Sequence, residues 1–174
     1  LKIIAADGVV LTAASDEKVY DGTALTNGKV TATGLPEGYS VEAKVEGSQT
    51  EVGDSANTIA SYVILDANKK DVTDQFTSVE KVDGVLKVTP LAVTVTITGN
   101  TDTKKYTGAE QQVEDYTVST GTTLYTENDF TFSGEAVAKG TEVDTYPMGL
   151  SEEQFKNNND NFTVTFDVTD GQLV

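Results

Sequence analysis

Apolar and polar residues alternate along many short segments of the chain. Val93, Val95 and Ile97 alternate with threonines, and Val41, Ala43 and Val45 with Ser40, Glu42 and Lys44. The same alternation runs through 162–169, where Phe and Val alternate with Thr and Asp, and through 130–132. A period of two with one apolar face predicts strands of antiparallel sheets that are buried on one side. The one helical signal is a single turn at 151–156, where Ser151 is a suitable N-cap ahead of two glutamates.

Glycines separate these segments and indicate turns. Asp83-Gly84 and Asp170-Gly171 are predicted hairpin turns, because glycine accepts the positive φ that such turns require. Short strands at roughly ten-residue spacing favour a sandwich or barrel. We therefore expect an all-β fold, made of Ig-like β-sandwich modules with about seven short strands each. The alternative is a β-grasp-like module, which requires one helix per copy.

The chain also repeats itself. Tyr20 and Gly22 return as Tyr106 and Gly108, and Phe76 returns as Phe162, all at an offset of 86 (106 − 20, 108 − 22 and 162 − 76). Gly84 returns as Gly171, and Gly47 and Gly53 align with Gly134 and Gly140, at an offset of 87 (171 − 84, 134 − 47 and 140 − 53). A period of this length suits a whole small domain.

The repeat predicts two tandem modules, residues 1–90 and residues 91–174. Their boundary falls near Pro90, because proline lacks the N–H that a strand ladder needs. A linker without a Gly/Ser run predicts a stiff, extended pair. Leu1-Lys2-Ile3 resembles Leu86-Lys87-Val88, so residues 1–4 are expected to be the last strand of a preceding copy.

The amino-acid composition narrows the range of possible functions of this chain. The chain has no Cys, His or Trp, all 12 basic residues are lysines, and the net charge is −16. Such a charge repels nucleic acid and anionic membranes. Without Cys and His, the commonest nucleophile–base pairs and most zinc sites are absent. No run of 18 apolar residues occurs, so we expect no membrane insertion in this segment. We predict that the protein is not an enzyme and needs no cofactor.

Two oxygen-rich loops were considered as ion sites. Asp66, Asn68, Asp71 and Asp74 offer oxygen ligands for calcium, but Lys69 and Lys70 lie among them, so a solvated loop is the favoured interpretation. The run 157–161 (NNNDN) carries one charge and is also interpreted as a loop.

Tyrosines and lysines supply the remaining candidates. Tyr20-Asp21-Gly22 is interpreted as a turn with a packed ring rather than as a ligand loop. Tyr146 is predicted to cap the loop before it through its hydroxyl, as a corner tyrosine does in Ig-like sandwiches, with Thr58 at its place in the first copy. An amide crosslink between a lysine and a buried asparagine is an option, with Lys18, Lys104 and Lys105 as the better-placed lysines.

The motifs of the first copy resemble a known family of modules. They are Val19-Tyr20-Asp21-Gly22-Thr23, Val52-Gly53-Asp54, Asp74-Gln75-Phe76 and Asp83-Gly84-Val85-Leu86. Together they resemble the "YDGT" repeat of large, multi-repeat surface proteins of Gram-positive bacteria, and the second copy is similar to a divergent member with Thr107 in place of Asp21.

The resemblance implies an extracellular stalk repeat, secreted or anchored to the cell wall, that projects a distal domain and carries no catalytic residue. Its partners would be neighbouring repeats of the same polypeptide, and we expect a monomer. The alternative function is an adhesive module that binds host glycan or protein. A cluster of exposed aromatic side chains on one sheet would favour that alternative.

Overall fold

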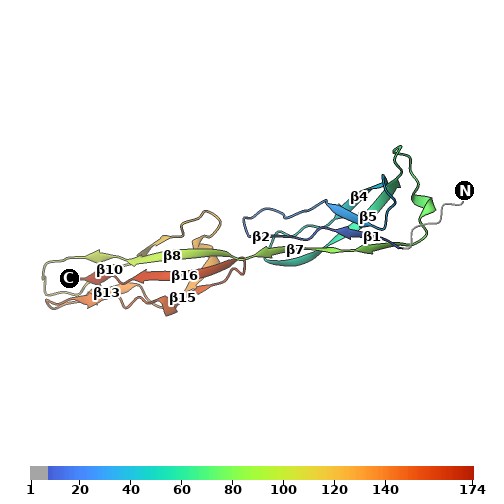
Figure 1. Ribbon diagram of the computed structural model, residues 1–174. Coiled ribbons are helices and arrows are strands. Elements are labelled where there is room, and N and C mark those ends of the chain that lie inside the picture. The colour runs from blue at the N-terminus through green and yellow to red at the C-terminus, as the bar shows by residue number, and fades with distance from the viewer. Residues whose placement is uncertain (1–7) are drawn as a thin grey trace, which may run out of the picture. The chain divides into compact units, whose positions relative to one another are not determined.

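The computed structural model describes residues 8–174, and it divides the chain into two compact units (Figure 1). The first, unit 1, ends at Thr89, and the second, unit 2, begins at Pro90, where the sequence placed the boundary. The strand expected at residues 1–4 lies outside the described residues. Unit 1 and unit 2 are all-β, and residues 8–174 contain no α-helix, so the helix that a β-grasp module requires is missing there. No helix of the described part is long and apolar enough to cross a membrane.

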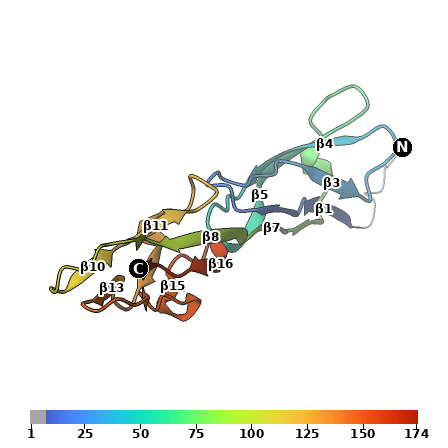
Figure 2. The ribbon, with the colours of Figure 1, turned by 90° about the vertical axis from the view of Figure 1, so that its left-hand side faces the viewer.

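Unit 1 consists of two sheets. Its strands are β1 (Val9–Ala13), β2 (Asp16–Val19), β3 (Val30–Thr33), β4 (Ser40–Glu46), β5 (Gly53–Leu65), β6 (Val79–Val82) and β7 (Gly84–Thr89), with a 3-10 turn η1 at Thr73–Gln75. One sheet has the order β3-β1-β6 and the other β2-β7-β5-β4. The long strand β5 pairs with β7 through its first half and with β4 through its second (Figure 2).

Unit 2 uses more and shorter strands. They are β8 (Leu91–Gly99), β9 (Thr101–Asp102), β10 (Gln111–Glu114), β11 (Tyr116–Ser119), β12 (Phe130–Phe132), β13 (Val137–Gly140), β14 (Tyr146–Pro147), β15 (Phe155–Asn157), β16 (Phe162–Thr169) and β17 (Gln172–Leu173). The 3-10 turns η2 (Glu127–Asp129) and η3 (Glu152–Gln154) interrupt them. The sheets have the orders β11-β8-β16, β14-β17-β9, β10-β13 and β12-β15.

Both units share one topological feature, a parallel pair of strands that changes sheets together. In unit 1 the first strand β1 pairs with β6, and after a break both continue as the parallel pair β2 and β7 in the other sheet. In unit 2 the pair β8 and β16 continues as β9 and β17 in the same way. Figure 1 shows β8 and β16 side by side. We call the point of the change the crossing.

The crossing corrects the predicted hairpin turns. The strands on either side of Asp83-Gly84 belong to different sheets and do not pair, and the same holds for Asp170-Gly171. Gly84 lacks a positive φ; a Cβ there would lie 2.2 Å from the Ala14 carbonyl oxygen. A Cβ on Gly171 would lie 2.4 Å from the Asn100 carbonyl oxygen. These glycines are therefore repeated because two backbones pass too closely for a side chain, not because of a turn.

Strand register corrects one part of the repeat alignment as well. Leu25 forms an antiparallel bridge with Gln49, and its equivalent Gln111 pairs with Gly140. Gly140 is therefore equivalent to Gln49 and not to Gly53. The offset between equivalent residues is 87 at Gly47 and Gly134 (134 − 47) and 91 at Gln49 and Gly140 (140 − 49). Unit 2 therefore has four additional residues between Gly134 and Gly140. Further residues around η3 divide the long strand β5 into β14 and β15. Glycines alone did not reveal these insertions.

Other sequence predictions agree with the structure. The alternating residues of β4, β8 and β16 alternate between more and less buried positions. At the predicted helical turn, the Ser151 N–H donates to the side-chain oxygen of Gln154 over 2.9 Å, at the start of η3. Gly22 and Gly108 have φ of 76° and 75°, so the two copies retain the same left-handed turn.

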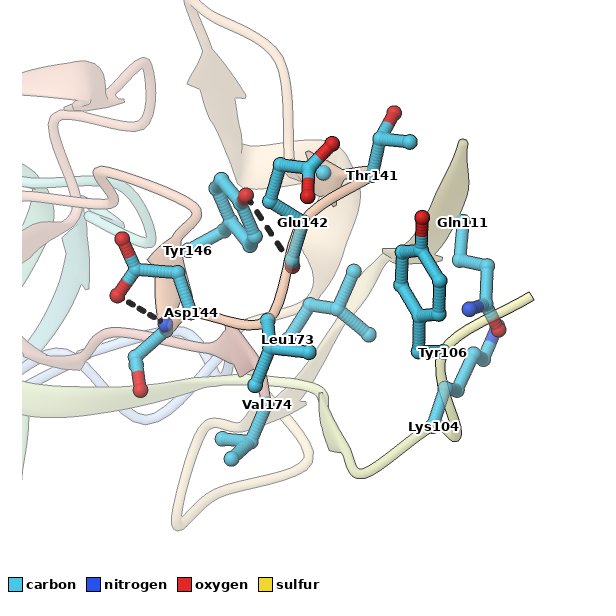
Figure 3. A pocket seen from close by; sticks show the side chains of 12 residues that line it. Lys104, Tyr106, Gln111, Thr141, Glu142, Asp144, Tyr146, Leu173 and Val174 are labelled. Atoms are coloured by element: carbon cyan, nitrogen blue, oxygen red, sulfur yellow. Dashed lines mark hydrogen bonds between the residues drawn. The ribbon is translucent and has the colours of Figure 1, made fainter. Parts of the chain in front are cut away.

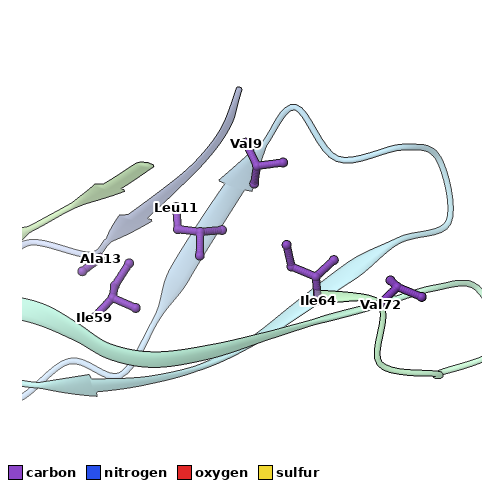
Figure 4. Close-up of a cluster of buried hydrophobic side chains, with 6 residues drawn as sticks. All are labelled: Val9, Leu11, Ala13, Ile59, Ile64 and Val72. Atoms are coloured by element: carbon purple, nitrogen blue, oxygen red, sulfur yellow. The ribbon is translucent and has the colours of Figure 1, made fainter. Parts of the chain in front are cut away.

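The two cores differ in composition. Unit 1 is built on buried aliphatic side chains from β1, β5 and the η1 region, namely Val9, Leu11, Ala13, Ile59, Ile64 and Val72 (Figure 4). Phe76 packs against this cluster from the side and meets Tyr39 edge-on at 6.1 Å between ring centroids. Unit 2 also has a buried aliphatic cluster, made of Ala138, Met148, Leu150 and Leu173. In addition, aromatic rings of unit 2 pack on one another, namely those of Tyr116, Tyr125, Phe130, Phe132, Phe155, Phe162 and Phe166.

Candidate binding pocket in unit 2

One hollow of the described residues lies in unit 2, where β10, β13, β14 and β17 come together. It has a volume of about 260 Å³, and we call it the end pocket. Its lining residues are Lys104, Tyr106, Gln111, Gly140, Thr141, Glu142, Val143, Asp144, Thr145, Tyr146, Leu173 and Val174. In Figure 3 the Tyr106 ring stands on the right, the loop with Glu142 and Asp144 lies to its left, and Val174 lies below this loop.

Tyr146 fixes the loop wall of this pocket. Its hydroxyl donates to the Glu142 carbonyl oxygen over 3.3 Å, four residues upstream (Figure 3). Its ring covers Gly140, where a Cβ would lie 2.0 Å from a ring carbon. This is the contact that the sequence predicted for a corner tyrosine. Register places Ser55, not Thr58, at the matching position of unit 1, since Ser55 lies opposite Leu86 as Tyr146 lies opposite Leu173.

The opposite wall carries Lys104 and Tyr106. The Lys104 ammonium donates to the Gln112 carbonyl oxygen over 2.5 Å and lies 3.8 Å from the Asp102 carboxylate. The Lys104 side chain therefore links the segment that follows β9 to strand β10. The Tyr106 side chain is 61% exposed and is the only aromatic among the large exposed hydrophobic side chains of residues 8–174. The described part of the chain thus has no surface cluster of aromatic rings.

In unit 1 the matching motif is a self-contained turn. The Asp21 carboxylate accepts hydrogen bonds from the Thr23 N–H at 2.9 Å, the Thr23 hydroxyl at 2.7 Å and the Lys18 ammonium at 2.6 Å. These bonds, led by the one from Lys18, lower the pKa of Asp21 to about 2. Tyr20 packs its ring on Leu25, Leu86 and Val88. In unit 2 only a 3.4 Å bond from Ala109 to the Thr107 hydroxyl remains.

The calcium candidates are engaged within their own loop. The Asp66 carboxylate accepts from the N–H groups of Asn68 and Lys70, at 2.8 and 3.0 Å. The Asp71 carboxylate accepts from the Thr73 N–H and hydroxyl, and these bonds lower the pKa of Asp71. Asp74 lies in η1. Within residues 8–174 no three acidic side chains gather closely enough to hold a metal ion. The loop geometry thus accounts for these residues without an ion.

The asparagine-rich run belongs to a half-buried polar network that the sequence did not reveal. The Tyr125 hydroxyl shares its one hydrogen between two acceptors, the Asp129 carbonyl oxygen at 3.2 Å and the Asn157 side-chain oxygen at 3.0 Å. The Asn157 amide reaches the carbonyl oxygens of Asn159 and Phe162, and the Asn159 amide reaches the Asp129 carboxylate at 2.7 Å. Burial and the nearby Asp129 carboxylate raise the pKa of Tyr125 to about 12. The network is therefore structural.

A buried polar residue of unit 1, Asn57, was also missed. It is 1% exposed, and its side-chain amide donates to the carbonyl oxygens of Ala14 at 2.9 Å and Asn27 at 2.7 Å. The available signal was an asparagine inside an alternating strand. When such a side chain is buried, it is expected to have hydrogen-bond partners.

The lysines considered for an amide crosslink have other partners. Lys18 contacts Asp21 and Thr23, and Lys104 contacts Gln112 and Asp102. Lys105 is exposed on the loop before Gly108, where its carbonyl accepts from the Gln111 amide. The buried Asn57 points to backbone carbonyls. The geometry therefore offers no support for a lysine–asparagine bond at these residues.

Comparisons with known proteins identified no relative. No family model matches the chain, and no curated protein and no solved structure is significantly similar to it. The functional argument therefore rests on the chain's own residues and topology.

Proposed function

We propose that this chain is a load-bearing stalk segment of a bacterial surface protein, built from two tandem Ig-like sandwich modules. The observation that carries the proposal is the parallel pair of terminal strands in each unit. In unit 2 the first strand β8 pairs with β16 over eight residue pairs, from Leu91 opposite Phe162 to Thr98 opposite Thr169. In unit 1 the pairs β1–β6 and β2–β7 contribute four residue pairs each.

The physical reason is the direction in which tension acts on this ladder. When two strands are parallel, the N-terminal end of one and the C-terminal end of the other lie at opposite ends of the pair. Tension applied through the chain ends therefore pulls the strands along their length, and the hydrogen bonds of the ladder share the load. Pulling from the same end would break the bonds one after another. Resistance to forced unfolding is set by the rate of unfolding, which the shared load lowers.

Three further observations support a mechanical role. Only Pro90 separates the last strand of unit 1 from the first strand of unit 2, so the chain between the modules is a single residue. The acidic residues are shared equally, 14 in residues 1–90 and 14 in residues 91–174, which favours solubility rather than one charged binding face. The motifs from Tyr20 to Leu86 resemble the "YDGT" surface repeats. From this resemblance we infer an extracellular location, secreted or attached to the cell wall, with neighbouring repeats as partners.

A single-molecule pulling experiment tests the proposal by changing only the direction of force. The chain has no cysteine, so introduced cysteines define the two attachment points. Pro90→Cys with Val174→Cys loads β8 and β17 from opposite ends. Pro90→Cys with Asp160→Cys loads β8 and β16 from the same end. All three positions are exposed, and both pairs load unit 2 alone.

We expect the first pair of attachment points to require a severalfold higher unfolding force than the second. Chemical denaturation of both double variants provides the control, because equal stability shows that direction alone causes the difference. Equal forces in the two directions would contradict the load-bearing role. Saturable binding of this chain to a glycan array or to mucin would instead support the adhesive alternative, for which Tyr106 is the exposed aromatic contact.

A further inference from the structure

One asparagine of unit 1 is followed by a glycine, and the pair lies in an irregular loop. Asn27-Gly28 is the single Asn-Gly pair of the sequence, since every other asparagine is followed by a residue with a Cβ. The pair lies between β2 and β3, outside any strand, with Gly28 exposed and Asn27 half-buried. Apart from its chain neighbours, no atom lies within 4 Å of the place of a Cβ on Gly28. The backbone at Gly28 therefore has room to move.

Two hydrogen bonds hold the Asn27 side chain over the Gly28 peptide group. The Lys29 N–H donates to the Asn27 Oδ1 at 3.0 Å, so the side chain spans the Gly28 nitrogen as in an Asx-turn. On the other side, the Asn27 Nδ2 donates to the Asp16 Oδ2 at 3.0 Å. The side-chain carbonyl carbon of Asn27 is thereby kept next to the Gly28 nitrogen.

This arrangement favours addition of the Gly28 nitrogen to that carbon. Negative charge develops on an amide oxygen when a nitrogen adds to the amide carbon, and an N–H already at hydrogen-bond distance stabilises this charge, as in an oxyanion hole. The Lys29 N–H is in that position. Within residues 8–174 no hydrogen bond holds the Gly28 N–H itself. Glycine also has no side chain that would crowd the approach of its nitrogen.

We propose that Asn27 is a site of spontaneous deamidation, through a cyclic imide formed with Gly28. The Gly28 nitrogen forms a bond to the Asn27 Cγ, the Cγ–Nδ2 bond breaks, and the proton of the Gly28 N–H leaves with the amide nitrogen as ammonia. Water then opens the imide. Addition of water at Cγ gives an aspartate. Addition at the main-chain carbonyl carbon gives an isoaspartate, whose chain continues through the side-chain carbon.

The modification acts on the crossing of unit 1. The Asn27 carbonyl oxygen accepts from the buried Asn57 amide at 2.7 Å, and isoaspartate moves this carbonyl because the main chain gains a carbon atom there. Either product also places a carboxylate beside that of Asp16 in place of an N–H donor. A hollow of about 490 Å³, lined in part by Asn27, Gly28 and Asn57, gives water access to the site.

Unit 2 has no equivalent of this site. The offset of 86 that Leu25 and Gln111 share places Val113 at the position of Asn27 (113 − 27), and valine has no amide to lose. Deamidation therefore changes unit 1 alone. The inference rests on the loop around Asn27 and not on the load-bearing function.

Asp-Gly pairs form the same imide, but those of the described residues are held differently. The hydrogen bonds to Asp21 lower its pKa to about 2, so its carboxylate stays ionised and accepts a nucleophile poorly. The other two pairs contain Gly84 and Gly171, where a Cβ would lie 2.2 and 2.4 Å from backbone oxygen atoms. The peptide groups there have no room to turn, so Asn27 is the favoured site.

The test uses the whole chain, kept folded at mildly alkaline pH in water enriched in heavy oxygen. Cleavage after lysine releases residues 19–29, and fragmentation of this peptide locates the label. We expect loss of the amide and uptake of label at Asn27, and neither at Asn100, which is followed by Thr101 and serves as an internal control. Gly28→Ala leaves the Asn27 side chain in place and should react severalfold more slowly, because a Cβ crowds the attacking nitrogen.

The effect on the crossing has its own measurement. Converted protein should unfold with a thermal midpoint of unit 1 at least about 4 °C below that of unconverted protein, the shift that loss of one hydrogen bond produces in a domain of this size. The midpoint of unit 2 should not change. Asn27→Asp adds the carboxylate without lengthening the main chain, so its shift should be smaller than that of the isoaspartate form.

Two results would overturn the proposal. One is a folded chain that keeps the Asn27 amide while the isolated peptide of residues 19–29 loses its own, because the fold would then protect the site. The other is an equal rate in Gly28→Ala, which would exclude attack by the Gly28 nitrogen. Equal unit 1 midpoints before and after conversion would overturn the effect on the crossing.

Discussion

Unit 1 and unit 2 hold the same crossing of strands with different side chains. In unit 1 Asn57 of β5 reaches across and donates to the carbonyl oxygens of Ala14 and Asn27. At the position of Asn57, unit 2 has Met148, whose N–H donates to the Gly171 carbonyl oxygen. There Asn100 donates to the Glu114 carbonyl oxygen, and Asp170 accepts from the N–H groups of Gly149 and Leu150.

The comparison separates what the fold requires from what it leaves free. The two units retain the parallel terminal strands, the close glycines at the crossing and the left-handed turn at Gly22 and Gly108. They differ in the core, since unit 2 adds a cluster of aromatic rings to its aliphatic side chains whereas the buried cluster of unit 1 is aliphatic, and in the polar groups that satisfy the backbone where strands leave a sheet. A buried carbonyl needs a donor, but several positions can supply one.

The largest expected effects come from the two cores. Phe155→Ala removes a ring that contacts Tyr116, Phe130, Phe132 and Phe166, and should destabilise unit 2 by about 3–5 kcal/mol. Leu11→Ala, at a fully buried site, should destabilise unit 1 by about 2–5 kcal/mol. Calorimetry on the whole chain should show one transition moving while the other stays in place. Leu124→Ala, at a site 40% exposed, is a control with an expected change within about 0.5 kcal/mol. If both transitions move with either core variant, the units do not unfold independently.

The crossing glycines should give the next largest effects. In Gly84→Ala and Gly171→Ala the new Cβ would lie 2.2 and 2.4 Å from backbone oxygen atoms that cannot move freely. We expect each variant to lose about 1–3 kcal/mol in its own unit, measured by urea denaturation. Gly28→Ala is the matched control, since no atom lies within 4 Å of a Cβ there. The loss at Gly84 would come from the close approach of the two backbones and not from a positive φ, which Gly84 lacks.

The crossing glycines also show how much of the fold could be predicted from the sequence. Alternation in 93–98 and 162–169 predicted the strands and their buried faces, because side-chain direction along a strand is a local property. Pairing is not local. Nothing in Asp83-Gly84 distinguishes a hairpin from a change of sheet, since both place a glycine between two strands. The four-residue insertion before Gly140 was hidden for the same reason, because two unrelated glycines happened to align.

The candidate pocket was less predictable still. Tyr106 and Tyr146 were singled out, and the hydroxyl contact of Tyr146 was anticipated. Their meeting at one pocket with Val143 and Leu173 depends on β10, β13, β14 and β17 coming together.

The polar groups at the crossing allow a direct test of the comparison. Asn57→Ala leaves the carbonyl oxygens of Ala14 and Asn27 without their donor in a buried place, which should cost unit 1 about 1–3 kcal/mol. Asn100→Ala removes one bond at a half-exposed site, so unit 2 should lose about 1 kcal/mol or less. Denaturation midpoints of each unit measure both. If Asn100→Ala lowers the stability of its unit more than Asn57→Ala does, the hydrogen bond of half-exposed Asn100 stabilises the crossing of unit 2 more than its exposure implies.

The last expected effect appears only at alkaline pH and is a loss of stability that depends on Tyr125. Burial, with a contribution from the Asp129 carboxylate, raises the pKa of Tyr125 from 10.0 to about 12 in the folded protein. A group whose pKa is raised by folding contributes stability that is fully present below its unfolded pKa and lost as pH rises through its folded pKa. Unit 2 should therefore lose stability between about pH 10 and pH 12, measured by its thermal midpoint alongside tyrosinate absorbance.

Tyr125→Phe separates this titration from the hydrogen bonds of the same hydroxyl. At neutral pH the variant loses the bonds to Asp129 and Asn157, which should cost unit 2 about 0.5–1.5 kcal/mol. Between pH 10 and pH 12 its midpoint should fall less steeply than that of the parent chain, because the group that must ionise on unfolding is gone. Some slope should remain, since burial also raises the pKa of Tyr116. An unchanged slope would mean that the Tyr125 hydroxyl reaches solvent in the folded unit, and the Asp129–Asn157–Tyr125 network would then not be the closed structure that its hydrogen bonds describe.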